Sequence, residues 1–405
     1  MDPSTLVRVL AVWLHRRRMQ RDARIKALAY HIFAYINKSP KRMSILKGTL
    51  WVDEVLSGNP NNCMETFRMP RTTFDKLVSA TVRHGGLRRT VNVSNQEQVA
   101  MLLYFAGHHA TSREMQCRFQ RSGETITRHL RSVMAAMRRM CQLYIKMPST
   151  TSPVHPNILH SRKFFPFFSN CRMAMDGTHI PVAVPSSMVA RFQSRKGVTM
   201  NVLAACDFDL KFTFVLAGWE GTAGDGKMFE AAKRLGIEAT GDQFDLMDAG
   251  FALTKHCLTP YRGTRYHLKE YGRGSRRPQT KEEIFNLRHA QLRNVIERIF
   301  GILKKRFPVL VYPVEYDFAF QVDMVLVLCM LHNFIRIHGD NDYFDAAPDE
   351  AAADDEAQRN DRVEDAVPDE PESNEAKLWR DSIASAIWSQ YQTTLRNRRR
   401  QRQIN

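Results

Sequence analysis

A change in hydrophobic pattern near Lys163 divides this chain into two kinds of structure. Residues 48–147 show the spacing of apolar residues that is typical of helices, and capping boxes at Ser94-Asn-Gln-Glu97 and Thr111-Ser-Arg-Glu114 indicate helix starts. After Lys163, short apolar runs separated by turn residues are typical of buried strands. The order predicts an all-α region followed by an α/β domain, whose mixed sheet is flanked by helices.

The second capping box begins a pair of helices with the layout of a helix-turn-helix. A short helix to Phe119 is followed by the turn Gln120-Arg-Ser-Gly123 and by a longer helix over residues 124–140. We expect Arg128 and Arg131, on the outer face of the longer helix, to contact DNA phosphates. Any helical bundle contains such corners, so the alternative is a purely structural role.

Two of the predicted strands end in an acidic residue. Residues 172–176 form an apolar run that ends in Asp176, and residues 244–248 form another that ends in Asp248. A third capping box at residues 280–283 begins a long helix to Lys305, which carries Glu297. The other elements predicted for this domain are strands over 201–206 and 212–217 and a helix over 228–235.

Three carboxylates on rigid elements are sufficient to hold divalent metal ions for phosphodiester cleavage. Two ions about 3.5–4 Å apart activate a water molecule and stabilise the leaving oxygen, and hard cations prefer oxygen ligands. Asp176, Asp248 and Glu297 are therefore candidate catalytic residues and ligands for two Mg²⁺ or Mn²⁺ ions. Acids at strand ends also cap helices or lie in solvent. By spacing alone, several other acids fit equally well: Asp207, Asp209, Asp225, Asp242 and Asp245.

The charge of the chain is unevenly distributed. Residues 340–375 hold 15 acidic residues against two arginines and few aromatic residues, which is typical of a disordered segment. Because the whole chain carries a net charge of +17, the remainder carries about +30. A globular part this basic usually binds a polyanion, most often nucleic acid. The alternative is a basic surface that is only solvated.

Cysteine usage and apolar runs indicate the compartment. The seven cysteines include no C-x-x-C pair, which predicts buried thiols in a reducing compartment rather than disulfides or a zinc site. The longest apolar run, residues 322–331, is too short to span a bilayer, so we expect no membrane contact. The arginine cluster at 396–402 is a candidate nuclear-import signal or nucleic-acid patch. We expect the nucleus, or the cytoplasm where import needs a partner.

Three segments together resemble the PIF/Harbinger superfamily of transposases and the nucleases domesticated from them. The first, Ala174-Met-Asp-Gly-Thr-His-Ile-Pro181, is similar to the family signature D-G-T-H-I. The second, Asp245-Leu-Met-Asp-Ala-Gly-Phe251, is similar to D-x-G-[YF]. The third, residues 285–306, resembles F-N-x-x-H…R-x-x-[VI]-E-x-x-F-G-x-L-K. Residues 218–225 and 261–268 also fit. The departures are Phe251, where Tyr is common, and Gly224, where His is frequent.

The resemblance is close over about residues 165–335 and looser over the helical region. It implies an RNase H-like fold, a Mg²⁺ cofactor and a DDE mechanism of DNA hydrolysis followed by strand transfer. Asp176, Asp248 and Glu297 match the three catalytic acids. The implied partners are double-stranded DNA and a Myb-like DNA-binding protein, and association into a homo-oligomer is left open.

Residues near these motifs have both a functional and a structural interpretation. His179 orients Asp176 or substrate, or makes a structural hydrogen bond. Asp225 is an auxiliary metal ligand, or caps the helix that starts near Met228. Arg293, as an accessory residue, balances the charge of Glu297 or holds phosphate.

The basic loop over residues 262–277 is expected to contact DNA. Its candidate contacts are Arg262, Arg265, Arg276 and Arg277.

These patterns predict five parts of the chain. They are a basic N-terminal segment (1–47), a helix-turn-helix-like DNA-binding region (48–150), an RNase H-like DDE nuclease domain (160–338), an acidic disordered linker (339–376) and a C-terminal amphipathic helix with a basic tail (377–405).

The favoured function is a metal-dependent DNA endonuclease or transposase of the DDE type. The alternative is a domesticated, non-catalytic DNA- or chromatin-binding protein that retains the fold. The presence of all three acids favours the enzyme, whereas the acidic segment suits a binding protein that recruits basic partners. An RNA-cleaving enzyme is a third interpretation, which the helix-turn-helix pattern disfavours.

Overall fold

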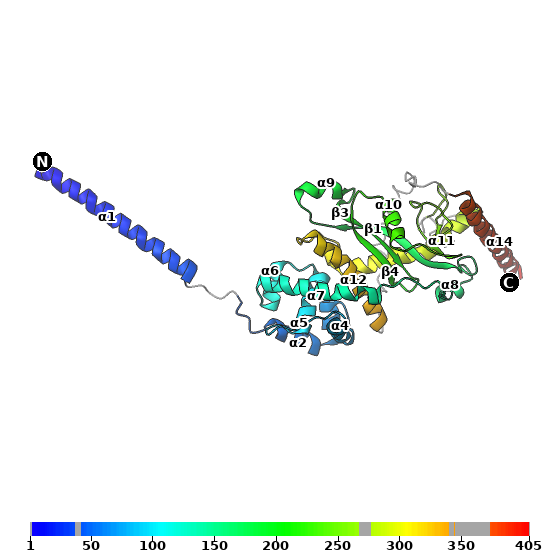
Figure 1. Ribbon diagram of the computed structural model, residues 1–405, viewed down its shortest axis with the longest axis horizontal. Coiled ribbons are helices and arrows are strands. Elements are labelled where there is room, and N and C mark those ends of the chain that lie inside the picture. The colour runs from blue at the N-terminus through cyan, green and yellow to red at the C-terminus, as the bar shows by residue number, and fades with distance from the viewer. Residues whose placement is uncertain (1, 37–41, 267–276, 340–343, 345–372, 405) are drawn as a thin grey trace. The chain divides into compact units, whose positions relative to one another are not determined.

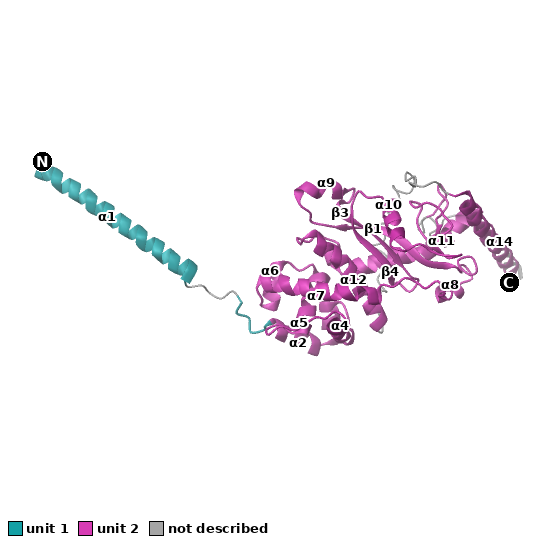
Figure 2. Cartoon of the chain, viewed as in Figure 1, with its two compact units in different colours: residues 1–47 teal, residues 48–405 magenta. Residues whose placement is uncertain are grey.

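The computed structural model describes residues 2–36, 42–266, 277–339, 344 and 373–404. The chain divides into two compact units, Met1–Lys47 and Gly48–Asn405 (Figure 2). The first unit consists of α1 (Pro3–His31) and a short π-helical stretch, η1 (Ile32–Ile36). No residue of α1 or η1 is buried, so these helices contain no hydrophobic core of their own.

The second unit begins with a helical region. Its helices are α2 (Gly48–Ser57), α3 (Pro60–Phe67), α4 (Arg71–Arg83), α5 (Asn95–His108), α6 (Ser112–Phe119) and α7 (Gly123–Tyr144). The helix starts predicted at residues 95 and 112 are confirmed. Thr111 and Glu114 form a reciprocal capping box, and the Glu97 amide donates to Ser94 Oγ at 3.1 Å. The two predicted helices α6 and α7 are therefore present, while their contact with DNA stays a prediction.

The Glu97 side chain does not complete the capping box expected at Ser94. Its carboxylate is fully buried and accepts hydrogen bonds from Thr49 Oγ1 at 2.6 Å and from Arg121 Nε at 2.9 Å. It thereby joins α2, α5 and the turn between α6 and α7. A buried carboxylate needs such partners because desolvation is costly, so this residue organises the helical region rather than one helix end.

A mixed sheet flanked by helices follows, which confirms the predicted class of the second region. Its strands are β1 (Cys171–Pro181), β2 (Gln193–Ser194), β3 (Gly197–Cys206), β4 (Phe212–Glu220), β5 (Phe244–Leu246) and β6 (Cys257–Leu258). β3 pairs antiparallel with β1, β2 and β4, whereas β5 pairs parallel with β1 and β6. β1 therefore lies at the centre of the sheet.

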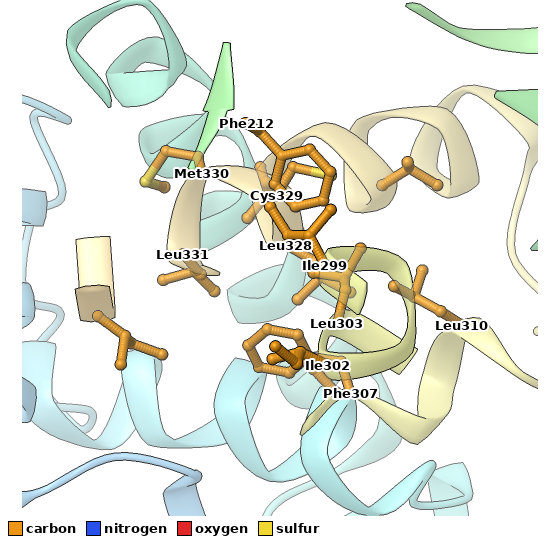
Figure 3. Packing of buried hydrophobic residues seen from close by; sticks show 14 of the residues in the cluster. Phe212, Ile299, Ile302, Leu303, Phe307, Leu310, Leu328, Cys329, Met330 and Leu331 are labelled. Atoms are coloured by element: carbon orange, nitrogen blue, oxygen red, sulfur yellow. The ribbon is translucent and has the colours of Figure 1, made fainter. Parts of the chain in front are cut away.

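Helices surround this sheet (Figure 1). They are α8 (Pro156–Leu159), η2 (Ser186–Met188), α9 (Val189–Phe192), α10 (Asp225–Arg234), α11 (Lys281–Arg306), η4 (Pro308–Leu310), α12 (Phe318–His338) and α14 (Asn374–Ile404). Ile299 and Leu303 of α11 pack with Leu328 of α12 and Phe212 of β4 in the main core (Figure 3).

Alternate residues of β1 face two separate cores. Ala174 and Ile180 belong to the core that contains α11 and α12. Met173 and Met175 belong to the core that contains Met228 of α10. Because successive side chains of a strand point to opposite faces of the sheet, Asp176 faces α11 and Gly177 faces α10.

α12 joins the helical region to the sheet. Its Asn333 side chain accepts from the Phe212 amide at 2.8 Å and donates to Phe212 O at 2.7 Å and Tyr144 O at 2.9 Å. By length and composition, this helix is the one in the described part of the chain that could cross a membrane, but 72% of its most apolar stretch is buried in the protein. Buried core helices of soluble proteins pass the same test.

The cysteines form no disulfide. Six of the seven are buried, as expected, and Cys117 is exposed.

A buried ion pair connects the two strands that precede the candidate acids. Arg172 of β1 and Asp245 of β5 are joined by Nη2–Oδ2 and Nε–Oδ1 contacts of 2.6 and 3.0 Å, and both side chains are at most 5% exposed. Burial raises the pKa of Asp245 to about 6, against the opposing effect of Arg172. Asp245 therefore has a structural role.

We expect Arg172→Met to lower the free energy of unfolding by about 3–5 kcal/mol, because it leaves Asp245 as an unpaired buried charge. The double variant Arg172→Met/Asp245→Leu should recover most of this loss. Urea unfolding followed by circular dichroism at pH 7.5 measures both. A single variant as stable as the wild type would contradict the assignment.

Candidate active site

Strand register places Asp176 and Asp248 at the same level of the sheet. β1 and β5 are parallel, and Ala174 pairs with Leu246. Asp176 and Asp248 each follow that pair by two residues. The sequence predicted that Asp176 ends its strand, and this is wrong, because β1 continues to Pro181. Asp248 lies just beyond β5, where the Gly250 amide donates to its Oδ1 at 2.8 Å.

One arginine links Asp176 to Glu297. Arg293 and Glu297 are one turn apart on α11, which contacts β1. Arg293 Nη1 donates to Asp176 Oδ2 at 3.0 Å, and Arg293 Nη2 donates to Glu297 Oε1. The side chains of Arg293, Asp176 and Glu297 are 6%, 2% and 16% exposed. The structure thus brings a strand acid and a helix acid to one buried cation.

The charge on Arg293 is stabilised by its surroundings. Burial alone lowers the pKa of this guanidinium, but Tyr266 and the negative charges of Glu297, Asp176 and Asp248 raise it well above its ordinary value. Asp248 is therefore close enough to contribute to the electrostatic field at the same cation. Asp176 and Glu297 thus contact Arg293 directly, and Asp248 acts on it through its charge.

A chain of hydrogen bonds holds Arg293 through its Nε atom. Its Nε donates to Tyr266 Oη at 2.8 Å, and that hydroxyl lies 3.3 Å from His289 Nδ1. His289 Nε2 lies 2.9 Å from Leu258 O, so it must carry the proton and donate. His289 Nδ1 is then the acceptor for the tyrosine hydroxyl. Burial lowers the pKa of His289 to about 3, which keeps the imidazole neutral at pH 7.

Asp225 lies on the other face of the sheet. A Cβ atom at Gly177 would be 2.5 Å from Asp225 Oδ1, so a glycine is required for the carboxylate to pack there. Asn201 Nδ2 donates to the same oxygen at 3.0 Å. Asp225 stands in the first turn of α10, whose N-cap is Gly224. The geometry therefore does not place it with Asp176 and Glu297 on the α11 face, and its role as a metal ligand stays a prediction.

Two polar residues of β1 complete the surroundings. His179 Nδ1 lies 3.0 Å from Thr199 Oγ1 of the neighbouring strand β3. This contact is the structural hydrogen bond that was one of the two interpretations of His179. Thr178, on the same face as Asp176, accepts a hydrogen bond from Lys304 Nζ at 3.2 Å. A second cation of α11 thus reaches β1 two residues after Asp176.

A cavity of about 460 Å³ adjoins the loop that follows Asp248. Aromatic side chains of Trp219, Phe229 and Phe251 line it, together with Gly250 of that loop. Lys227 and Arg234 of α10 add positive charge, whereas Lys233 is paired with Glu230 at 2.5 Å. The cavity is therefore suited to a ligand with both flat apolar and anionic parts.

The carboxylates have the chemistry of a divalent-metal site. They offer oxygen donors, which hard cations prefer, and Asp176 and Glu297 already hold a positive charge in the form of the Arg293 guanidinium. In their present arrangement, however, the described residues contain no group of three His, Cys, Asp or Glu side chains spaced to ligate one ion. The carboxylate oxygens are suitable ligands for a metal ion, but the spacing between Asp176 and Glu297 matches the Arg293 guanidinium instead.

Some arginines of the basic loop over residues 262–277 have structural contacts within the protein. Arg262 Nη2 donates to Ala249 O at 2.6 Å and thereby supports the loop after Asp248. Arg265 lies 3.6 Å from Glu283. Arg277 is exposed, and Arg276 lies outside the described residues. DNA contact by these arginines stays a prediction.

The predicted arginines of α7 form ion pairs. Arg128 Nε lies 3.4 Å from Glu124 one turn away, and Arg131 Nη2 lies 2.5 Å from Asp317 at the start of α12. Both arginines are exposed. Arg131 therefore connects two helices, besides any contact with DNA.

The sequence did not indicate the importance of Tyr266, His289 and Asn201. Tyr266 and His289 lie within segments that match the family resemblance, but nothing in their spacing shows that they support Arg293. Asn201 is an ordinary residue of an apolar run. Only the fold places these side chains beside the acidic residues.

Comparisons with known proteins agree with the resemblance. Residues 175–333 match a family model described as DDE superfamily endonuclease, and residues 43–139 match a domain of unknown function. The chain is 24% identical to "Protein ALP1-like" of Arabidopsis thaliana over 308 residues, which cover 69% of this chain and 71% of that protein.

The chain is also 25% identical to "Putative nuclease HARBI1" of Homo sapiens over 173 residues. The protein of the same name from Bos taurus is equally similar. The match covers 41% of this chain and 46% of each relative, so the chain spans less than half of their length. No solved structure matches significantly.

The buried His289 predicts a dependence of stability on pH. Because its pKa drops from 6.5 to about 3 on folding, the native protein binds fewer protons than the unfolded chain between these values. Stability is therefore lost as pH falls below about 6.5. We expect His289→Gln to lose less stability than the wild type between pH 7 and 5, by up to about 1.4 kcal/mol per pH unit.

Glutamine can accept from Tyr266 and donate to Leu258 O without titrating, which makes it a suitable replacement. Urea unfolding at pH 7, 6 and 5 gives the comparison, and other buried histidines are common to both proteins. Equal losses in the two proteins would show that His289 does not titrate as described.

Proposed function

We propose that this protein is a divalent-metal-dependent nuclease that cuts DNA, on the premise that residues 175–333 match the family model described as DDE superfamily endonuclease. The observation that carries the proposal is that Arg293, a single buried cation, contacts both Asp176 of β1 and Glu297 of α11. Asp248, in the loop after β5, stands at the same level of the sheet as Asp176 and acts on Arg293 through its charge. Three separate elements supply the acids, so the geometry is set by the fold and not by one flexible loop.

The strand order supports an RNase H-like fold for this domain. β4, β3 and β1 are antiparallel neighbours, and β5 and β6 extend the sheet in parallel from β1. In this arrangement the central strand β1 carries Asp176, its neighbour β5 precedes Asp248, and α11 supplies Glu297. The same arrangement is what the family resemblance implies.

Asp176, Asp248 and Glu297 would hold the metal, with Mg²⁺ or Mn²⁺ as the ion. Bound there, the metal would lower the pKa of a water molecule and stabilise the charge that develops on the leaving oxygen. The chain's own groups prepare the ligands: the Gly177 and Gly250 amides donate to Asp176 Oδ1 and Asp248 Oδ1, both at 2.8 Å. Transposition would add a second phosphoryl transfer, in which a DNA 3′-hydroxyl replaces water.

Two basic surfaces are proposed to bind double-stranded DNA. Lys227 and Arg234 at the cavity beside α10 are exposed and form no ion pair within the described part of the chain. Arg128 and Arg131 on α7 are exposed but paired with acids. Unpaired cations lose no existing contact when phosphate binds, so we infer that the α10 surface contributes more to affinity.

Partners and location follow from the proposed activity. A Myb-like DNA-binding protein would help to target the nuclease, and a homo-oligomer would allow two DNA ends to be cut together. We propose that the protein is located in the nucleus, or in the cytoplasm where its import needs that partner. Arg396, Arg398 and Arg400 are exposed on α14, which suits an import signal.

A non-catalytic DNA- or chromatin-binding protein is the second candidate. The observation that favours it is the absence of a group of three potential metal ligands among the described residues. Such a protein would use Arg293 as a permanent replacement for the metal. The two candidates differ in whether purified protein cuts DNA when a divalent ion is supplied.

We expect Asp176→Asn, Asp248→Asn and Glu297→Gln each to reduce DNA cleavage below detection, because each removes one metal ligand while preserving shape. Nicking of supercoiled plasmid in Mg²⁺ or Mn²⁺ measures the activity. Asp242→Ala, which removes an exposed acid of the same domain, is the control and should cut normally. A wild type that binds plasmid without nicking it would favour the non-catalytic protein.

We expect Lys227→Ala/Arg234→Ala to weaken DNA binding and to reduce the slope of log affinity against log salt by up to about 1.8, since each lost phosphate contact removes about 0.9. Arg128→Ala/Arg131→Ala should have a smaller effect. Filter binding of a short duplex between 50 and 300 mM salt compares them. A larger effect of the α7 variant would reverse the assignment of the two surfaces.

A further inference from the structure

We propose that Arg293 is a built-in counter-ion, which neutralises the carboxylates of the metal-free protein and has to release Asp176 and Glu297 before a divalent ion can bind between them. The inference rests on the proposed function, because it concerns the same metal site. The inference adds that Arg293 competes with the metal ion for the same carboxylates and thereby lowers the affinity of the site for the metal.

The first argument is occupancy. The two Nη atoms of Arg293 donate to Asp176 Oδ2 and Glu297 Oε1, so the guanidinium stands between the two carboxylates. A divalent ion such as Mg²⁺ requires its oxygen ligands at about 2.0–2.1 Å, gathered around one point. The guanidinium fork holds them farther apart, which agrees with the lack of a metal-spaced group among the described residues.

The second argument is charge. Asp176 and Arg293 are 2% and 6% exposed, so little water is available to screen them. Asp248 contributes to the field at Arg293 together with Asp176 and Glu297. Two carboxylates held close together at low solvent exposure repel strongly unless a cation lies between them. Arg293 provides that cation when no metal is bound.

The third argument is that Arg293 has a partner independent of the carboxylates. Its Nε donates to Tyr266 Oη, and His289 connects that tyrosine to Leu258 O. This chain of hydrogen bonds ends on β6 and involves no acid of the site. The arginine can therefore give up Asp176 and Glu297 and remain held by Tyr266, whose hydrogen bond does not compete with the metal.

The experiment measures Mn²⁺ binding to the full-length chain by isothermal titration calorimetry, together with thermal stability with and without Mn²⁺. Arg293→Gln removes the internal cation. Arg298→Gln is the matched control, because it removes the same charge from the next turn of α11, where Arg298 forms no ion pair with the described residues. Arg293→Lys retains the charge but cannot bind both carboxylates through a planar fork.

We expect Arg293→Gln to bind Mn²⁺ at least tenfold more tightly than the wild type, and Arg298→Gln to bind it as the wild type does. Without metal, Arg293→Gln should melt at a lower temperature than the wild type, and Mn²⁺ should raise its melting temperature by more. Should this variant fail to fold, Arg293→Lys decides the question, with an expected increase in affinity of a few fold.

Equal or weaker Mn²⁺ binding by Arg293→Gln, with normal binding by the wild type, overturns the inference and leaves the metal site intact. If only Arg293→Lys folds, equal or weaker Mn²⁺ binding by that variant likewise overturns the inference. No Mn²⁺ binding by the wild type or by either Arg293 variant overturns the metal site itself, and the inference with it. Binding by an Arg293 variant alone supports the counter-ion role.

Discussion

The ion pairs of Arg293 with Asp176 and Glu297 are the interaction on which the site depends. Burying carboxylates away from water is costly unless each finds a charged or hydrogen-bonding partner. Here one guanidinium serves two carboxylates directly and lies in the field of a third, Asp248. Its position is set in turn by Tyr266, which accepts a hydrogen bond from Arg293 Nε, and by His289, which supports that tyrosine. The acidic site and the neutral hydrogen-bond chain therefore form one structural unit, in which the acids can be close together before any metal is present.

The sheet brings that unit together through register. β1 and β5 are parallel, and the Arg172–Asp245 pair joins them in the buried part of the sheet. Two residues beyond the last paired position, Asp176 and Asp248 reach the same level. The alternation of side chains along β1 then sends Asp176 toward α11 and Gly177 toward α10. That alternation explains why Asp225, although its carboxylate packs directly on Gly177, is separated from the acids that meet at Arg293.

The basic residues show how a high positive charge is divided between folding and binding. Arg262 supports the loop after Asp248, Arg131 connects α7 to α12, and Arg172 and Arg293 are internal partners of buried acids. These side chains are largely committed to contacts within the protein. Lys227 and Arg234, which form no such contact with the described residues, are the more available groups for a polyanion. A large net charge therefore indicates a polyanionic partner, but it does not identify the side chains that touch it.

The sequence by itself determined the kinds of elements and the candidate acids. Capping at Thr111 and Thr280 depends on residues three positions apart, and the strands depend on local apolar runs, so both could be predicted. The three acids were selected because they lie in motifs with a family resemblance. Only the tertiary structure decided that β1 extends beyond Asp176 and that Asp245 pairs with Arg172. It also decided that Asp225 is separated from Asp176 and Glu297, and that Tyr266 and His289 support Arg293. The partner of a charged side chain depends on distances of a few ångströms between segments far apart in the chain, and no local pattern encodes those distances.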